Sequence, residues 1–466
     1  MSEKQLKTWG PLILLVFCVS AAHAQDSIDT PKPAMTGDNT ASLQSGAPTD
    51  TPDTRPLAGV QNLSLGSKTS SHSFLLPSFG VTSQVQVNPY GSSLADNSSP
   101  ASVTYVSGRL ALNKVSPRSE LLLDYLAAGG FSNYSNQSSS LIQGLDFSET
   151  IRGGRWSQMF GEQFSYLPAA AFNFGGLGGV GNFGVSLAAV GVTPGFRQDI
   201  VPNQSILTNG ADRVSNATMA QTTYALGYRS SLSFFGTYGI LHFLDGGLQD
   251  NSIISTGAGY NYLLSPLNSM SVSYGFSRLM FAHLPVGADS HTILFSLARR
   301  ISGRMSFQVG AGPDIQVYRA PLAGSGMTLN WTLNSGLNYQ LRNWGTGFMY
   351  SHSLTGGSGV LAGAETDMVS GHAGRTFGSL QTSVNLGYSR NRAVQTSLSA
   401  ISPQTWFAGA QASRRFVSFG SLFIAYNVSR QSSLAAVCSV PACQTNALTQ
   451  SISLGYNWGF RPIILE

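Results

Sequence analysis

The sequence predicts an all-β fold, a transmembrane antiparallel up-and-down β-barrel that follows a cleaved signal peptide and a disordered tether. Three observations predict it. Charged residues make up only 10% of the chain, against roughly 25% in a typical soluble domain. After the N-terminal region, no segment approaches the roughly 20 continuous apolar residues of a spanning helix. Apolar and polar residues instead alternate in segment after segment, as in a barrel wall between lipid and a polar lumen.

The N-terminal region predicts export. Two lysines precede an apolar run that is too short to span a membrane as a helix, and Ala22-His23-Ala24 is an A-x-A cleavage site. The following residues are rich in Thr, Ser, Pro, Gly and Asp, a composition typical of disordered segments. We therefore divide the chain into a signal peptide over 1–24, a periplasmic tether over 25–77 and an outer-membrane barrel over 78–466.

Eighteen segments of the barrel region carry the strand pattern, with sixteen as the alternative count. They are 79–88, 102–113, 119–128, 141–151, 155–167, 217–228, 231–243, 252–264, 269–280, 290–301, 303–318, 326–341, 344–355, 363–376, 379–391, 404–417, 420–430 and 447–460. Connections after the even-numbered segments are tight, and those after the odd-numbered segments are long. Short periplasmic turns, long outer loops and an even strand number are typical of bacterial outer-membrane barrels.

One connection differs from the others. Residues 168–216 form a long, Gly-rich loop that is too apolar to extend into solvent. Two interpretations stay open: the loop folds into the lumen and narrows or plugs it, or residues 180–193 add a further hairpin to the wall. The inward fold is the favoured interpretation.

The segment 327–342, "MTLNWTLNSGLNYQLR", shows how the two faces of the wall are assigned. Its odd positions are mostly Leu, Trp and Tyr, and its even positions are mostly Thr, Asn and Gln. Because successive side chains of a strand point to opposite faces, the odd positions are expected to meet lipid. The even positions Asn330, Asn334, Asn338 and Gln340 are expected to line the pore.

Aromatic residues near the ends of the segments predict a girdle at each lipid interface. At the inner rim they are Trp156, Trp344, Phe377, Phe416, Trp458 and Phe460. Near the long loops they are Phe243, Phe281, Tyr318 and Tyr350.

The charge balance suggests a mildly basic pore. The chain holds 26 Lys+Arg and 21 Asp+Glu; five and six of these precede residue 78, so 21 basic and 15 acidic groups belong to the barrel region. By alternation, the arginines expected to point into the lumen at its inner end are Arg152, Arg229, Arg300, Arg304 and Arg342. Acidic residues expected to neutralise part of this charge are Glu120, Asp124, Asp146 and Asp314. A ring of positive charge favours anions in transit.

No residues predict catalysis. The one candidate group, near the outer loops, is His242, Asp245, Asp250, His283, Asp289 and His291, and no motif fixes its geometry. We therefore predict no enzyme activity, no metal, no cofactor and no nucleic-acid partner. Cys438 and Cys443, with four residues between them in an oxidising compartment, are expected to form a local disulfide, because a metal pair lacks further nearby ligands.

Four features resemble bacterial outer-membrane β-barrel proteins of the porin type. They are the A-x-A signal, the repeated Leu-Gly-Tyr pieces at 226–228, 386–388 and 454–456, the aromatic final strand and the long loop after the fifth strand. The chain departs from the pattern by continuing past Phe460 to Glu466 and by lacking facing acid and base ladders. The resemblance implies the cell outer membrane of a Gram-negative-type bacterium. It also implies contact with outer-membrane lipid and lipopolysaccharide, the barrel-assembly machinery as a partner during biogenesis, and a homo-oligomer as one candidate state.

The function expected from these features is a porin-like channel for passive passage of small polar or anionic solutes. The alternative is a barrel component for the export or surface attachment of a polysaccharide or other polymer, with the tether engaging a periplasmic partner.

Overall fold

The computed structural model describes residues 73–87, 100–132, 140–167, 212–244, 249–282, 287–319, 326–355, 363–394, 403–417, 420–432 and 446–465. Within these ranges, no helix is long and apolar enough to cross a membrane. The predicted signal peptide, most of the predicted tether and the two cysteines expected to form a disulfide lie outside the described residues. So does residue range 168–211, most of the exceptional loop.

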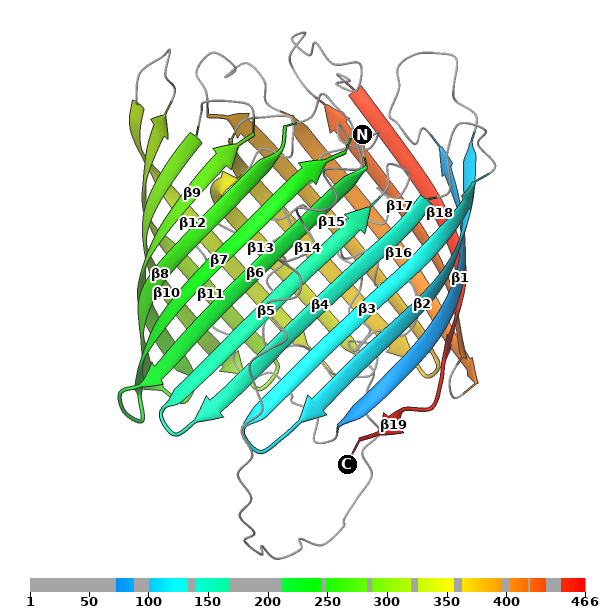
Figure 1. Ribbon diagram of the computed structural model, residues 1–466, viewed down its shortest axis with the longest axis horizontal. Coiled ribbons are helices and arrows are strands. Elements are labelled where there is room, and N and C mark those ends of the chain that lie inside the picture. Colours follow the sequence, from blue (N-terminus) through cyan, green and yellow to red (C-terminus); the bar gives the residue numbers. More distant parts are fainter. Residues whose placement is uncertain are drawn as a thin grey trace, which may run out of the picture. The chain divides into compact units, whose positions relative to one another are not determined.

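The described strands form one antiparallel sheet that closes into a barrel, because β1 pairs with both β2 and β18 (Figure 1). Their bounds are β1 Phe74–Val87, β2 Ala101–Val115, β3 Ser119–Ser132, β4 Ser140–Gly153, β5 Trp156–Leu167, β6 Arg213–Ala225, β7 Ser230–Phe243, β8 Asn251–Ser265, β9 Asn268–Phe281, β10 Gly287–Ser302, β11 Met305–Arg319, β12 Gly326–Gln340, β13 Trp344–Thr355, β14 Ala364–Phe377, β15 Leu380–Ala393, β16 Gln404–Val417, β17 Gly420–Ser432, β18 Asn446–Gly459 and the short β19 Ile463–Ile464. The predicted barrel and its count of eighteen long strands are confirmed.

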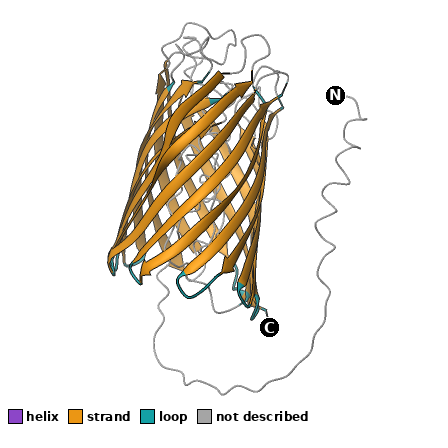
Figure 2. Ribbon diagram, turned by 90° about the vertical axis from the view of Figure 1, so that its left-hand side faces the viewer, coloured by secondary structure: helices purple, strands orange, loops and turns teal. Residues whose placement is uncertain are grey.

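Short turns join the strands at one end of the barrel (Figure 2), and at the other end more residues of sequence separate consecutive strands. β4 ends at Gly153 and β5 begins at Trp156, with Gly154 at a φ of 50°. Gly378, between β14 and β15, has a φ of 61°. Positive φ angles suit glycine in such tight turns. The predicted alternation of tight and long connections is therefore confirmed, and it assigns the tight turns to the periplasmic end.

The C-terminal residues close the seam of the barrel. β19 lies at the tight-turn end and pairs with the first residues of β1, Phe74 with Ile464 and Leu75 with Ile463 (Figure 1). The Phe460 amide also donates to the Pro77 carbonyl at 3.0 Å. β1 thus begins inside the range expected to be tether, because the residues after Phe460 supply it with a further partner.

The two faces of the wall differ as the alternation predicts. Along β18, Ile452 and Leu454 are 53% and 51% exposed, whereas Ser451 and Ser453 are 1% and 3% exposed. Large apolar residues therefore form the outer surface, and small polar residues line the inner one.

The aromatic girdles agree with the prediction only in part. The inner set, Trp156, Trp344, Phe377, Phe416, Trp458 and Phe460, is between 40% and 57% exposed on the outer face, as predicted. For the outer set, the prediction was wrong at Phe243 and Phe281. These two residues are buried on the lumen face, at 5% and 7% exposure. Tyr318 also points inward, since its hydroxyl donates to Gln316 on the lumen face. Phe131 and Trp406 are exposed near the long-loop end instead.

Glycines on the lumen face make room for phenylalanine rings from neighbouring strands. A Cβ added to Gly387 would overlap the ring of Phe407, and one added to Gly455 would overlap the ring of Phe423. Such covering of a strand glycine by a cross-strand aromatic ring stabilises the sheet. Two of the three Leu-Gly-Tyr pieces are explained in this way. The third, at 226–228, follows the end of β6 and lies in a turn rather than in a strand.

The outer face of β5 and β6 carries a polar spot among the apolar residues. Glu162 lies six positions beyond Trp156 on the outward parity, and its carboxylate accepts from Asn216 Nδ2 and from Thr218 Oγ1, each at 2.6 Å. Both donors lie on the same face because their strand pairs with β5 in register. Local hydrogen bonds therefore satisfy a carboxylate that a lipid-facing wall disfavours.

Candidate pore

The amide residues expected to line the pore lie together on β12 and face the lumen. Asn330 is opposite Asp314, Asn334 is opposite Gly310, and Asn338 is opposite Ser306, all on the inner face of β11. Gln340, at the end of the strand, is exposed. Small neighbours such as Gly310 and Ser306 leave these amides as the most prominent groups on this part of the wall.

Asp314 is held by neutral donors rather than by an arginine. Its carboxylate accepts from Ser290 Oγ at 2.5 Å, Thr292 Oγ1 at 2.9 Å and Gln316 Nε2 at 2.7 Å. The residue is 3% exposed. Asp314 is therefore part of the wall, where it organises hydroxyl and amide groups of β10 and β11, and it does not neutralise the inner arginines.

The five arginines expected at the inner end divide into two groups. Arg152 and Arg300 lie on the lumen parity of their strands, and Arg152 Nη2 donates to Glu120 Oε2 at 3.1 Å. Arg229, Arg304 and Arg342 lie in the tight turns, beyond the ends of the strands, where alternation no longer fixes the direction of a side chain. The structure thus does not bring the five together as one inward ring on the strands.

Sequence reasoning missed a buried ion pair on the lumen face. Arg109 of β2 donates through Nε and Nη2 to both carboxylate oxygens of Asp124, at 2.6 and 2.7 Å. Their side chains are only 8% and 9% exposed. Both parities of β2 hold apolar residues, so alternation gave no sign that Arg109 faces inward.

Charge is nearly balanced over the lumen face of the described strands. Its arginines are Arg109, Arg152, Arg213, Arg300 and Arg415, and its carboxylates are Glu120, Asp124, Asp146 and Asp314. Five positive and four negative groups leave a difference of one. This face is therefore mainly a surface of hydroxyl and amide groups.

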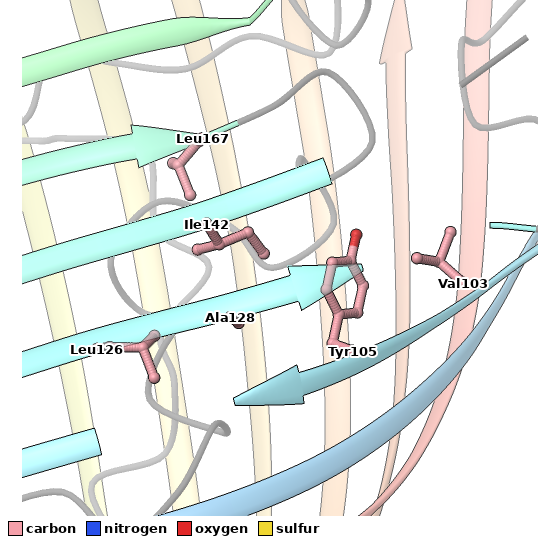
Figure 3. Packing of buried hydrophobic residues seen from close by; sticks show 6 residues of the cluster. All are labelled: Val103, Tyr105, Leu126, Ala128, Ile142 and Leu167. Carbon is pink, nitrogen blue, oxygen red and sulfur yellow. The ribbon is translucent and has the colours of Figure 1, made fainter. Parts of the chain in front are cut away.

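The lumen face becomes apolar toward the long-loop end. Side chains of six residues from β2 to β5 gather there, and all are at most 4% exposed: Val103, Tyr105, Leu126, Ala128, Ile142 and Leu167 (Figure 3). Leu241 and Phe243 of β7 form a second buried group on the same face. Alternation separates the two faces without showing what covers the inner one, so it did not indicate this apolar area.

The wall splits between β12 and β13 at the long-loop end. β12 pairs with β11 along Gly326–Tyr339, but it pairs with β13 only along Leu333–Gln340. β13 continues past the split, to Thr355, paired only with β14. At the fork, the Trp331 ring stacks on His352 with centroids 4.3 Å apart. Thr332 Oγ1 also donates to the His352 carbonyl at 3.1 Å.

Beyond the fork, β13, β14 and β15 turn into the lumen. Leu354 has the outward parity of Phe348, yet it packs against Leu279, Phe281 and Ala288 on the lumen face of β9 and β10. Val394, which follows β15, packs against the same cluster. The outer face of these strand ends therefore covers the inner face of the β9–β12 wall. We call the described residues 353–355 and 363–366, at the adjoining ends of β13 and β14, the tucked hairpin.

Polar contacts accompany this overlap of two layers. Asn330 on the lumen face of β12 donates to Glu365 of the tucked hairpin and, at 3.2 Å, to Gln316. Next to these residues on β14, Asp367 contacts His352 at 2.6 Å and accepts from Arg392 at 3.2 Å. The ends of β13 and β14 thus form a second layer inside the β9–β12 wall. The lumen is therefore narrower here than the number of strands alone implies.

The candidate catalytic group separates into unrelated contacts. His242 Nδ1 is 2.5 Å from Asp250, His291 Nδ1 is 2.8 Å from the Tyr274 hydroxyl, and Asp289 binds arginines. Asp245 and His283 lie outside the described residues. Among the residues that the structure covers, no three His, Cys, Asp or Glu side chains are arranged to hold a metal ion.

A closed sheet with an apolar, aromatic-edged exterior and a polar interior satisfies every backbone group at membrane depth. The chain is an outer-membrane β-barrel. No protein-family model and no curated protein matches it.

Solved structures with some likeness to the chain include the outer membrane protein OpdK of Pseudomonas aeruginosa. The chain is similar to Pseudomonas aeruginosa OpdQ, with 13% identity and a TM-score of 0.42 over 84% of this chain and 99% of the other. For P. aeruginosa OpdK, solved with vanillate, identity is 9% and the TM-score 0.41 over 83% and 99%. For the FrpB iron transporter of Neisseria meningitidis, the values are 8% and 0.39 over 84% and 82%. These likenesses are low, so the fold rests on the strand pairings themselves.

Proposed function

We propose that the barrel is a porin-like channel through which small polar solutes cross the outer membrane passively. The closed ring of eighteen strands carries the proposal, since barrels of about 16 to 18 strands leave room for an aqueous lumen. Hydroxyl and amide groups on the inner face replace part of the hydration of a polar solute without holding it tightly.

Reconstitution in planar bilayers tests the channel directly. We expect stepwise increases in current as single barrels insert, because hydroxyl and amide groups line much of the inner face of a closed ring of eighteen strands. Folded protein is recognised by its heat-dependent migration in detergent gels. Folded barrels that insert into vesicles but carry no current would contradict the proposal.

The charge balance of the lumen favours uncharged polar solutes over strongly anionic ones. Arg109 and Arg152 each bind a carboxylate on the same face. Anionic solutes are the second candidate, supported by the arginines of the inner end, Arg300, Arg304 and Arg342. Replacing these three by Gln should move selectivity toward cations if they act on ions in transit.

The Arg109–Asp124 pair gives a sharper prediction for selectivity. Asp124→Asn removes a negative charge from the lumen and leaves Arg109 without its carboxylate, so the channel should favour anions more strongly. Because one unit charge changes the lumen potential by the order of kT, the chloride-to-potassium permeability ratio should rise about two- to threefold. Reversal potentials in a KCl gradient measure this ratio.

Two further variants separate a lumen effect from a general one. Arg109→Gln should shift the reversal potential in the opposite direction. Glu162→Gln removes the same charge from the outer face and should leave the potential unchanged. Equal shifts for Asp124→Asn and Glu162→Gln would mean that the Arg109–Asp124 pair does not act on permeating ions.

A further inference from the structure

Two arginines on the outer face of the barrel share one carboxylate. Arg278 of β9 donates to Asp289 through Nε at 2.8 Å and through Nη2 at 3.0 Å, and Arg319 of β11 donates to Asp289 Oδ2. Asp289, on β10 between them, is 8% exposed as a side chain, whereas the two arginines are 40% and 55% exposed. The carboxylate is thus covered while both guanidinium groups stay accessible.

The cluster faces away from the lumen. Arg278 alternates with Leu279, which is buried in the lumen, and shares its face with the exposed Met280. Asp289 shares its face with Ile293, which is 43% exposed. Neither the pore nor a solute within it can reach these groups, so the channel function does not explain them.

The cluster also lies at the long-loop end, where the outer leaflet meets solvent. Arg319 is the last residue of β11, and Asp289 is the third residue of β10. On the side toward the membrane, the Arg278 guanidinium lies 5.8 Å from the centre of the Phe276 ring. Tyr274, 47% exposed, holds His291 through its hydroxyl at 2.8 Å. Aromatic side chains toward the membrane centre and cationic side chains toward solvent are typical of a membrane interface.

The charges do not cancel within the cluster. Each guanidinium carries five N–H donors; Arg278 gives two of them to Asp289, and Arg319 gives one. One carboxylate therefore fixes the direction of two cations and leaves one unit of positive charge with most of its donors directed outward. A planar guanidinium pair of this kind matches the geometry of a phosphate group.

We propose that Arg278 and Arg319 bind a phosphate of an anionic glycolipid in the outer leaflet of the membrane. Asp289 is the positioning residue that holds both guanidinium groups in place. The acyl chains of the lipid would lie along Tyr274, Phe276 and Ile293, which continue the outer face toward the membrane centre. The inference concerns the outer wall, and it stands or falls independently of conductance.

Native mass spectrometry of the detergent-extracted barrel tests the proposal with three lipid A forms that share their acyl chains and carry two, one or no phosphates. The wild-type barrel should retain the phosphorylated forms and release the dephosphorylated one. Arg278→Gln with Arg319→Gln should lower the retained fraction about tenfold or more, since each charge-assisted pair contributes on the order of a factor of ten.

Three comparisons decide the result. Arg375→Gln, which removes an outward arginine at the opposite rim, should not change lipid retention. Arg319→Gln alone leaves the Arg278–Asp289 pair intact and should reduce lipid retention without affecting folding. This single variant provides the result if the double variant assembles poorly. Inorganic phosphate should compete only at far higher concentration than the lipid. Equal retention of the three lipid forms, equal loss in Arg375→Gln, or displacement by inorganic phosphate at lipid concentrations would overturn the proposal.

Discussion

Replacing Gly312 by alanine should prevent the barrel from assembling, or should lower its free energy of unfolding by about 3 kcal/mol or more. A Cβ on Gly312 would fall far inside van der Waals contact of the Ile293 carbonyl oxygen. The obstacle is backbone, which has no alternative rotamer. β10 and β11 would have to move apart at this point.

The local sequence explains this close approach. Pro313 follows Gly312 and has no N–H, so it cannot contribute a ladder hydrogen bond. Paired residues are interrupted here, between Thr292–Asp314 and Phe295–Ala311, while the register on the two sides is the same. A glycine lets the strands come together across the gap, and any side chain on the lumen face would separate them.

Gly236→Ala is the matched control. Gly236 also lies within a strand, β7, but an added Cβ would meet nothing within 4 Å. The free energy of unfolding of the Gly236→Ala variant should differ from that of the wild type by less than about 0.5 kcal/mol. Urea titrations of both variants in lipid vesicles, followed by gel migration, measure the difference. Wild-type-like unfolding of Gly312→Ala would show that the strands tolerate a wider spacing than the structure has.

Glycine positions illustrate what the sequence predicts and what it leaves open. Alternation and turn residues suffice to predict the strands, their order and the two ends of the barrel, because the alternation and the turns are local properties of a chain that crosses a membrane. Whether a glycine fills space or permits contact depends on the neighbouring strand. Alternation places Gly312 on the lumen face and Gly236 on the lipid face, but the contact of Gly312 with the Ile293 carbonyl depends on the neighbouring strand and is not visible in the sequence.

The lumen shows the same limit. Alternation correctly separated Asn330, Asn334 and Asn338 from the lipid face, because one strand decides that. It did not indicate that Phe243 and Phe281 face inward, since inward apolar residues need a cover that other segments supply. Nor could it find the Arg109–Asp124 pair, whose two members come from different strands with apolar residues on both faces.

The tucked hairpin is the feature of the lumen that we expect to limit the width of the channel. The hairpin gives up ladder pairing with Gly326–Thr332 of β12 and gains burial of Leu354 against Leu279 and Phe281. Burying one leucine contributes about 1.5–3 kcal/mol, and the contact between Asn330 and Glu365 adds a hydrogen bond to a charged group. These contributions offset an exposed strand edge, so the inward position is held by a few specific contacts.

Shortening the tucked hairpin should therefore widen the channel. Replacing residues 354–365 with an Asn-Gly turn keeps the Ser353–Thr366 pair and suits a two-residue hairpin. Because conductance follows the narrowest section of a pore, single-channel conductance should rise about twofold or more. Shortening the connection 433–445 between β17 and β18 is the control and should leave conductance near the wild-type value.

A cross-link tests the same arrangement without deleting residues. In a background with Cys438→Ser and Cys443→Ser, Asn330→Cys and Glu365→Cys place two thiols at positions whose side chains are in contact. A short bifunctional thiol reagent should join them and leave the conductance at the uncross-linked level, because it fixes the hairpin where it already lies. Failure to cross-link, or unchanged conductance after the deletion, would mean that β13 and β14 do not narrow the pore. If both results hold, strands rather than loops set the width of the lumen at this end, and the contacts of Leu354 and Glu365 determine how large a solute can pass.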